Sequence, residues 1–234
     1  MPREMAATYE NAVVLESLAM KALLTTIRRK STKQAEYVDC CDRLCAMLAE
    51  EALARLPGTV CGSAVETPCG TIEGDASVVT VAPETICLVD VMRSGAILQE
   101  AVRRVVPSAK TAKILIQRDE ATAQPVLMYS KLPPKIETLT VLLCDPMLAT
   151  GGSALTAIDV LKKAGVKEEN ITFANVVSCP EGLANLAKNA PKVKVVTCAC
   201  DSGLDEKKYI VPGLGDFGDR YYGTFGYEEK LWGC

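Results

Sequence analysis

The pattern of hydrophobic and polar residues changes once along this chain, near residue 86. Apolar side chains in residues 8–30 recur at spacings that predict a first helix. A stronger helical pattern follows, which begins at the capping-box sequence Ser31-Thr32-Lys33-Gln34. Pro57, followed by a glycine, ends this second predicted helix. Residues 59–82 are rich in Val, Thr and Gly, and they predict short strands of an appended flap or hood.

From residue 86 onward, apolar segments typical of buried strands alternate with segments of helical spacing. The expected strands are 86–91, 112–116, 140–144, 171–177 and 193–198, and the expected helices are 95–104, 153–163 and 181–188. Strands that are apolar on both faces and separated by helices predict an α/β fold, with a mostly parallel sheet flanked by helices. Ligands of such sheets bind beyond the carboxyl ends of the strands, so we expect the chemistry in the loops that follow them.

The size and charge of the chain fit one domain over residues 1–234. The chain has 234 residues, of which 49% are hydrophobic, and its net charge is −3. This balance leaves no basic surplus to neutralise phosphates, so nucleic acid is not an expected partner. The absence of a run of about 18 apolar residues argues against a membrane partner. Charges also interrupt the N-terminal segment, which argues against a secretory signal. We therefore expect a cytoplasmic protein.

Histidine is absent from the sequence, and cysteine is abundant, with 11 copies. The lack of histidine excludes Ser-His-Asp triads, Cys-His pairs and histidine-ligated metal sites. Most cysteines lie in apolar segments, their number is odd and no C-x-x-C spacing occurs. We therefore expect small buried side chains that remain thiols. A metal site at Cys40, Cys41 and Cys45 would need further ligands that the sequence does not obviously supply.

The loop from Asp145 to Ser153, Asp-Pro-Met-Leu-Ala-Thr-Gly-Gly-Ser, carries the most information about function. A buried strand ends in a carboxylate, and the loop then reaches Thr-Gly-Gly-Ser at the start of a helix. Glycines let the backbone approach a ligand, and the free N–H groups at a helix start favour an anion. An isolated Thr-Gly-Gly-Ser is more often a simple helix cap. With Asp145 upstream as an acceptor for hydroxyls, the pattern instead describes a site for a ribose 5-phosphate.

Two arginines follow neighbouring strands at the same expected edge of the sheet. Arg93 precedes a helix, and Arg118 lies in a Gln-Arg-Asp-Glu segment after the next strand. Both cations can pair with a diphosphate there, whereas the alternative is a solvated ion pair that stabilises little. Residues 119–137 contain few constraining hydrophobic residues. They fit equally a mobile lid that excludes water and an ordinary surface hairpin.

A glycine-rich segment near the C-terminus contains the spacing G-x-G-x-x-G at Gly213, Gly215 and Gly218. We do not interpret it as a dinucleotide fingerprint. Only 16 residues follow Gly218, and they lack the helical period and the βαβ context that the fingerprint requires. Backbone N–H and C=O groups in such a segment can instead be exposed to a flat ligand.

These motifs together resemble the uracil phosphoribosyltransferase family, which has the type I phosphoribosyltransferase fold, from about residue 23 to residue 224. The segment DPMLATGGS is similar to the family's binding loop for 5-phosphoribosyl 1-diphosphate (PRPP), and YIVPGLGDFGDR is similar to its uracil loop. The resemblance implies a flap and base-binding hood made from residues 59–82 and 200–225, with residues 1–30 as an N-terminal extension. Ser94 departs from the family's usual alanine but leaves the adjacent arginine and glycine in place.

The resemblance also implies roles for individual residues. Contacts with PRPP are expected from Arg93, Arg118, Asp145, Pro146, Met147, Leu148, Ala149, Thr150, Gly151, Gly152, Ser153 and Asp216. Contacts with uracil are expected from Ile210, Gly215, Asp216 and Phe217. The expected catalytic residues are Asp145, Asp216 and Arg118.

The implied reaction joins N1 of uracil to C1 of PRPP and gives UMP and diphosphate, a step of pyrimidine salvage. Mg2+ is the implied cofactor, bound through the PRPP diphosphate and not by protein ligands. The resemblance implies that the chain forms a homodimer or homotetramer. It also implies a possible GTP effector, because some relatives are activated by GTP. Residues 18–23 of this chain depart from the family's usual histidine-proline-leucine start. The alternatives are a catalytically silent nucleotide-binding regulator, a transferase for another nucleobase and, more distantly, a nucleotide-binding oxidoreductase.

Overall fold

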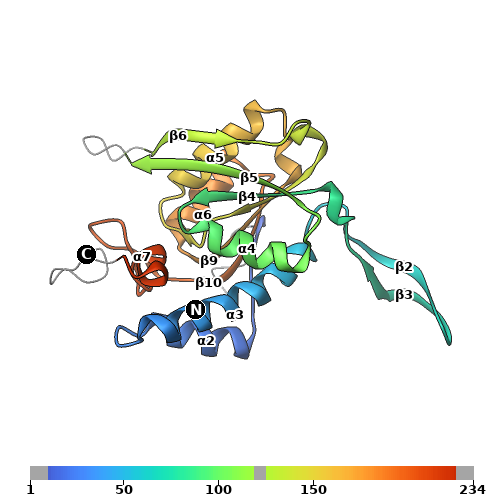
Figure 1. The fold of residues 1–234 in the computed structure, drawn as a ribbon, viewed down its shortest axis with the longest axis horizontal. Coiled ribbons are helices and arrows are strands. Elements are labelled where there is room, and N and C mark those ends of the chain that lie inside the picture. Colours follow the sequence, from blue (N-terminus) through green and yellow to red (C-terminus); the bar gives the residue numbers. More distant parts are fainter. Residues whose placement is uncertain (1–9, 119–124, 225–234) are drawn as a thin grey trace.

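An eight-stranded sheet forms the centre of the computed structural model, which describes residues 10–118 and 125–224 (Figure 1). Seven strands follow one another in the order β1-β10-β9-β7-β4-β5-β6, and β8 pairs with β9. All these pairings are parallel except that of β5 with β6. The strands are β1 Ala12–Val14, β4 Ile86–Met92, β5 Lys110–Arg118, β6 Pro125–Lys131, β7 Thr140–Cys144, β8 Met147–Leu148, β9 Ile171–Ser178 and β10 Lys194–Cys200.

Alternating side chains of the strands feed two hydrophobic cores, one on each face of the sheet. In β4, Ile86 and Leu88 belong to one core, whereas Cys87 and Val89 belong to the other. The first core is covered by α2 Leu18–Arg28, α3 Gln34–Leu53 and α4 Gly95–Val105. The second is covered by α5 Gly152–Lys163 and α6 Pro180–Asn189. The predicted α/β architecture with helices on both faces is therefore confirmed.

The segment after β10 packs against the N-terminal helices. It contains the short antiparallel pair β11 Gly203–Leu204 and β12 Ile210–Val211, followed by α7 Phe217–Tyr222, which packs on α3. The antiparallel hairpin of β2 Val60–Thr67 and β3 Gly70–Val79 projects from the opposite end of the molecule (Figure 1). Within one chain, residues 59–82 and the segment after β10 therefore lie far apart.

The first predicted helix is wrong at its N-terminal end. Residues 12–14 form β1, which pairs in parallel with β10, and the N–H of Leu15 donates to the Thr197 carbonyl at 2.8 Å. The helix begins only at Leu18, after Ser17, whose hydroxyl accepts a hydrogen bond from the Met20 N–H at 3.4 Å. The edge of β10 offers backbone partners that helical spacing in the sequence does not reveal. Residues 8 and 9 lie outside the described part of the chain.

The predicted capping box is also wrong. The second helix starts at Gln34, and its cap residue, Lys33, makes no capping bond with its side chain. The Thr32 hydroxyl instead donates to the Thr26 carbonyl at 2.6 Å, because the preceding helix ends close by. The other predicted strands and helices agree with the structure to within about two residues.

Residues 125–131 form β6, antiparallel to β5, where the sequence indicated either a lid or a surface hairpin. The described part of this region is thus a hairpin strand, and residues 119–124 lie outside the described ranges. Seven of the ten described cysteines are buried thiols, as predicted, whereas Cys61 and Cys69 are exposed on the β2–β3 hairpin. In the described ranges, we find no helix with the length and apolar character needed to cross a membrane.

Candidate active site

Backbone contacts with β9 hold the loop after β7 in place. The N–H of Asp145 donates to the Ala174 carbonyl at 3.3 Å, and the Pro146 carbonyl accepts from the N–H groups of Val176 and Val177 at 2.9 and 3.0 Å. The next two residues form β8, which extends the pairing with β9. The Asp145 carboxylate is therefore anchored at the carboxyl edge of the sheet, where the sequence placed it.

The Thr-Gly-Gly-Ser sequence forms the start of α5, as predicted. Gly151 caps the helix with φ +81°, and a Cβ atom there would approach the Leu186 side chain to 2.9 Å. The Asn185 side-chain amide donates to the Thr150 carbonyl at 2.8 Å. The thiol of Cys179 donates to the Ala149 carbonyl at 3.0 Å. The first N–H groups of α5 have no partners within the helix, which favours an anion at this corner.

A cavity of about 390 Å³ lies beside this loop at the carboxyl edge of the sheet. Its lining residues come from the loop after β4, the loop after β7 and the glycine-rich segment near the C-terminus. They are Ser94, Asp145, Met147, Ala149, Lys207, Lys208, Tyr209, Ile210, Gly215, Asp216, Phe217 and Gly218. The cavity thus unites residues of the two principal motifs of the sequence.

Asp145 and Asp216 are the two carboxylates in this cavity. The pKa of Asp145 is raised to about 7, mainly by burial among protein atoms and to a smaller extent by the nearby negative charge of Asp216. The Met147 N–H, which donates to Asp145 Oδ1 at 3.3 Å, opposes this shift. Asp216 caps α7 by accepting the N–H of Asp219 at 2.7 Å. The pair therefore combines one carboxyl that titrates near neutrality with one that is fixed by the backbone.

All four residues expected to contact uracil line the cavity. Gly215 has φ +81°, a conformation that favours glycine. Phe217 is buried, with its ring edge-on to that of Tyr37 at a centroid distance of 5.9 Å. Phe217 therefore also ties the loop to α3, so its side chain serves the core as well as the cavity wall. The glycine-rich segment follows β12 of a two-stranded sheet and opens a helix of only six residues, which is not the βαβ setting of a dinucleotide fingerprint.

Several expected PRPP contacts do not line this cavity. Pro146, Leu148 and the Thr150–Ser153 segment form the loop backbone and the start of α5 next to it. Arg93 instead directs its guanidinium to α7, where it pairs with the Asp219 carboxylate and donates to the Thr224 hydroxyl at 2.9 Å. The side chain of Arg118 lies outside the described part of the structure.

Five residues that line the cavity were not among the contacts predicted from the sequence: Ser94, Lys207, Lys208, Tyr209 and Gly218. Lys208 adopts φ +68°, and the loop is closed by Asp205, whose Oδ1 accepts the N–H groups of Lys207 and Tyr209 at 2.9 and 2.8 Å. The signal available in the sequence was a pair of lysines immediately before the glycine-rich segment. Such a pair more often belongs to a solvated surface.

No group of three or more His, Cys, Asp or Glu side chains that could hold a metal ion occurs in the described ranges. The cavity offers a metal only two carboxylates, Asp145 and Asp216. Any divalent cation here would thus need most of its ligands from a bound substrate and from water.

The mostly parallel sheet, covered by helices on both faces and with an acidic loop and a helix start at one edge, is the type I phosphoribosyltransferase fold. An adenine phosphoribosyltransferase from Trypanosoma brucei has the same fold, with a TM-score of 0.52 and 12% identity over 85% of this chain and 87% of that one. The AQ2163 protein from Aquifex aeolicus is more similar, with a TM-score of 0.75 and 31% identity over 92% of this chain and 100% of that one.

Sequence comparisons identify the family within this fold class. The family model for uracil phosphoribosyltransferase matches residues 14–224. A uracil phosphoribosyltransferase from Dictyostelium discoideum is 48% identical over 216 residues, which are 92% of this chain and 97% of that protein. The chain belongs to the uracil phosphoribosyltransferase family, and it is accordingly a pentosyltransferase.

Proposed function

We propose that the cavity holds uracil and PRPP together and joins N1 of the base to C1 of the sugar, giving UMP and diphosphate. The observation that carries this proposal is that Asp145, from the loop after β7, and Gly215, from the glycine-rich segment, line the same cavity. Residues that two separate motifs predict to bind the two substrates thus line one cavity, as the transfer of a group between two substrates requires.

The loop after β7 supplies the PRPP side of this site. The N–H groups at the start of α5 and the hydroxyls of Thr150 and Ser153 hold the 5-phosphate as a fixed handle, with Gly151 and Gly152 giving access to the backbone. Asp145 accepts hydrogen bonds from the ribose hydroxyls. The residues between them, Pro146, Met147, Leu148 and Ala149, present the loop backbone to the sugar. Arg93 and Arg118 neutralise the diphosphate.

The glycine-rich segment supplies the base side. Main-chain groups of Ile210, Gly215, Asp216 and Phe217 pair with the edge of uracil, and all four residues line the cavity. A base with a donor in place of one uracil acceptor would leave buried main-chain groups unpaired, which gives discrimination against cytosine.

Cleavage of the C1–diphosphate bond develops positive charge on the ribose ring. The carboxylates of Asp145 and Asp216 favour that charge electrostatically, because both face the same cavity. Uracil N1 loses its proton as the new bond forms. The acceptors within the cavity are these carboxylates and the departing diphosphate, so proton transfer needs no histidine.

The residues present fit Mg2+ that enters with its substrate. Magnesium prefers oxygen ligands and commonly keeps waters and substrate phosphates. Asp145 and Asp216 are the carboxylates that would face it. When bound, Mg2+ would supply charge neutralisation to the leaving diphosphate.

The decisive experiment incubates the purified chain with Mg2+, PRPP and a mixture of uracil, cytosine, adenine and hypoxanthine, and identifies the nucleotide formed. We expect UMP alone. We also propose GTP as an effector, and adding GTP to the same assay tests this. Formation of a purine nucleotide, or no nucleotide at all, would contradict the proposal.

We also propose that the chain acts in the cytoplasm and as a homodimer or homotetramer. All ten described cysteines are free thiols, which is typical of a reducing compartment. Apolar side chains are exposed on both strands of the β2–β3 hairpin, which supports burial against another copy of the chain. Sedimentation of the purified protein tests the assembly.

A further inference from the structure

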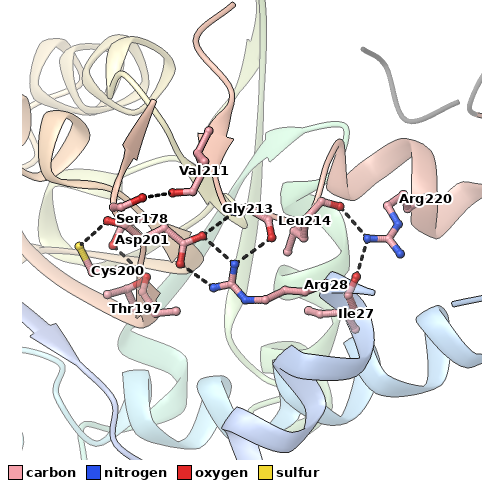
Figure 2. A network of polar contacts seen from close by, with 12 residues as sticks. Ile27, Arg28, Ser178, Thr197, Cys200, Asp201, Val211, Gly213, Leu214 and Arg220 are labelled. Carbon is pink, nitrogen blue, oxygen red and sulfur yellow. Dashed lines mark hydrogen bonds and ion pairs between the residues drawn. The ribbon is translucent and has the colours of Figure 1, made fainter. Parts of the chain in front are cut away.

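A network of polar contacts holds the glycine-rich loop from outside the cavity (Figure 2). Arg28 on α2 and Asp201, directly after β10, form a two-pronged ion pair. Arg28 Nη1 lies 2.7 Å from Asp201 Oδ2, and Arg28 Nη2 lies 2.7 Å from Asp201 Oδ1. The Asp201 side chain is 6% exposed and that of Arg28 is 22% exposed. Because a buried carboxylate needs such partners, each residue fixes the other.

Both members of this ion pair bind Gly213. Arg28 Nη1 donates to the Gly213 carbonyl at 2.8 Å, and the Gly213 N–H donates to Asp201 Oδ2 at 2.8 Å. Gly213 has φ +59°, and a Cβ atom there would lie 2.0 Å from the Ile210 carbonyl oxygen, so this turn requires glycine. The whole backbone of Gly213 is thus held by the ion pair, two residues before Gly215 enters the cavity lining.

A second arginine holds the next residue from the opposite direction (Figure 2). Arg220 on α7 is buried, and its Nη1 donates to the carbonyls of Leu214, at 2.6 Å, and Ile27. Its Nη2 donates to the Arg29 carbonyl at 2.9 Å, and the guanidinium lies 4.3 Å from the centre of the Tyr37 ring. Two arginines therefore link the C-terminal end of α2 to the loop. Arg28 belongs to α2 itself, and Arg220 comes from α7.

From these contacts we propose that Arg28 and Asp201 are positioning residues for uracil. Neither residue lines the cavity, so they act by fixing the backbone that leads to Gly215 and Asp216. The PRPP loop is anchored on β9 and α6, and within the described ranges no hydrogen bond joins it to the side chains of Arg28 and Asp201. The two sides of the site approach each other at the end of β9, where the Asp201 N–H donates to the Ser178 carbonyl at 2.8 Å. Loss of the pair therefore disturbs the base side of the site, which includes Asp216, more than the part of the sugar side that the loop after β7 supplies. This role rests on the proposed function of the glycine-rich loop as the uracil site.

The test compares Arg28→Met, Arg28→Lys and Asp201→Asn by their KM for uracil, their KM for PRPP and their kcat. In Arg28→Met and Asp201→Asn, we expect the KM for uracil to rise about 10-fold to 100-fold, because charge-assisted hydrogen bonds are lost, with the KM for PRPP changed less than about threefold. Arg28→Lys keeps the charge but has no planar fork, so its KM for uracil should be intermediate. The double variant Arg28→Met/Asp201→Asn should be no worse than the more damaged single variant, since the two residues act as one unit.

Two matched controls separate positioning from general stability. Lys21→Met removes an exposed cation from the same helix. Leu161→Ala weakens the core on the opposite face of the sheet, where Leu161 is fully buried. Both should keep the wild-type KM for uracil. If Arg28→Met fails to fold, the ratio of the two KM values in Arg28→Lys and Asp201→Asn decides.

Equal increases of both KM values in the Arg28 and Asp201 variants would overturn the positioning role. A raised KM for uracil in Leu161→Ala would overturn it as well, because stability alone would then explain the effect. A wild-type protein that forms no UMP would instead refute the proposed function itself. Normal wild-type turnover with an unchanged KM for uracil in the variants would refute only the role of this ion pair.

Discussion

At the scale of single residues, the chemistry of this site depends on how the protein treats two neighbouring carboxyl groups. Asp145 has a pKa raised to about 7 by burial and by the charge of Asp216. Asp216 is held by the backbone of α7. The ionised form of Asp145 is a stronger hydrogen-bond acceptor than the protonated form, so under the proposed function PRPP should bind more tightly above about pH 7 than below it.

Asp145→Asn should lower kcat by about 100-fold or more, because it removes charge that favours the ribosyl cation. It should also stabilise the fold. The native pKa of Asp145 lies above its unfolded value near 4, so the native state binds more protons, and its stability falls as pH rises from about 4 to 7. The gain in unfolding free energy over wild type should therefore be about 1–3 kcal/mol larger at pH 8 than at pH 5. Urea titrations at both pH values measure it.

A pH profile provides the matching activity measurement. Wild-type kcat/KM for PRPP should fall on the acidic side of about pH 7, and this limb should be missing from the residual activity of Asp145→Asn. Because PRPP phosphates also titrate below neutrality, a limb that is identical in both proteins would assign the effect to the substrate. Near-normal turnover of Asp145→Asn would remove this residue from the mechanism.

Gly215→Val should raise the KM for uracil by about 30-fold or more, with little effect on PRPP affinity. A branched side chain is strained at the positive φ of Gly215 and would also enter the base side of the cavity. Gly74→Val is the matched control, because Gly74 has φ +68° and open space around it on the remote hairpin. Titration calorimetry with each ligand gives the two affinities, and parallel losses of both would contradict the assignment of the uracil loop.

At the scale of elements, the site forms where the ends of strands and the starts of helices meet at one edge of the sheet. Asp145 directly follows β7, α5 starts at Gly152 within the Thr150–Ser153 segment, and the loop after β4 carries Arg93. Close contacts keep these elements in register. A Cβ atom on Gly95 would lie 2.3 Å from the Cys144 carbonyl oxygen, so the start of α4 and the end of β7 can approach only with glycine at this position.

Gly151→Ala should weaken PRPP binding about tenfold and destabilise the fold by about 1–2 kcal/mol, because alanine is strained at φ +81° and crowds Leu186. Gly165→Ala provides the comparison at the other end of α5. Its φ is +91°, so a similar loss of stability is expected, but it lies far along the helix from the phosphate corner. Thermal unfolding and PRPP titrations of both variants separate strain from ligand binding, and equal PRPP affinities would argue against the phosphate site.

Arg93→Ala should weaken PRPP binding about tenfold and reduce its dependence on ionic strength. Arg93 pairs with Asp219 in this structure, so Asp219→Asn is the informative companion. If Arg93 served only to hold α7, both variants would behave alike. We expect instead that Asp219→Asn keeps or improves PRPP affinity, because the guanidinium is released for the diphosphate. Fluorescence or calorimetric titrations at two salt concentrations measure both.

At the scale of the whole molecule, the β2–β3 hairpin extends away from the body of the chain (Figure 1). A two-stranded hairpin without a core is marginal in water, yet this one exposes several apolar side chains. They include Val60, Ile72, Val78 and Val79, which are 40–56% exposed. These exposed side chains support our proposal that the hairpin packs against a second copy of the chain.

Val78→Lys combined with Val60→Lys should therefore shift the protein toward the monomer in analytical ultracentrifugation. The body of the chain should keep its circular dichroism spectrum, because the hairpin makes few contacts with it. Leu18→Lys is the control, since Leu18 is 86% exposed and lies on α2. An unchanged assembly in the hairpin variant, or the same shift in the control, would contradict the role of the hairpin.

The sequence by itself determined the elements whose signals are local. Apolar runs such as 140–144 predicted buried strands, and the change from that strand to Thr-Gly-Gly-Ser predicted the start of α5, because both patterns depend on neighbouring residues. The motifs also contain residues from both sides of the cavity, such as Asp145 and Gly215, and the chain belongs to the family that the motifs resemble.

Only the tertiary structure decided what depends on partners distant in the chain. Val13 lies in β1 because β10 offers it backbone hydrogen bonds, and Arg93 lies against α7 because Asp219 folds beside it. Arg28 gives no local sign of its contact with Gly213, 185 residues later. A one-dimensional pattern records which side chains recur along a helix or strand, whereas pairing energies across the fold decide which of several compatible partners each polar group meets.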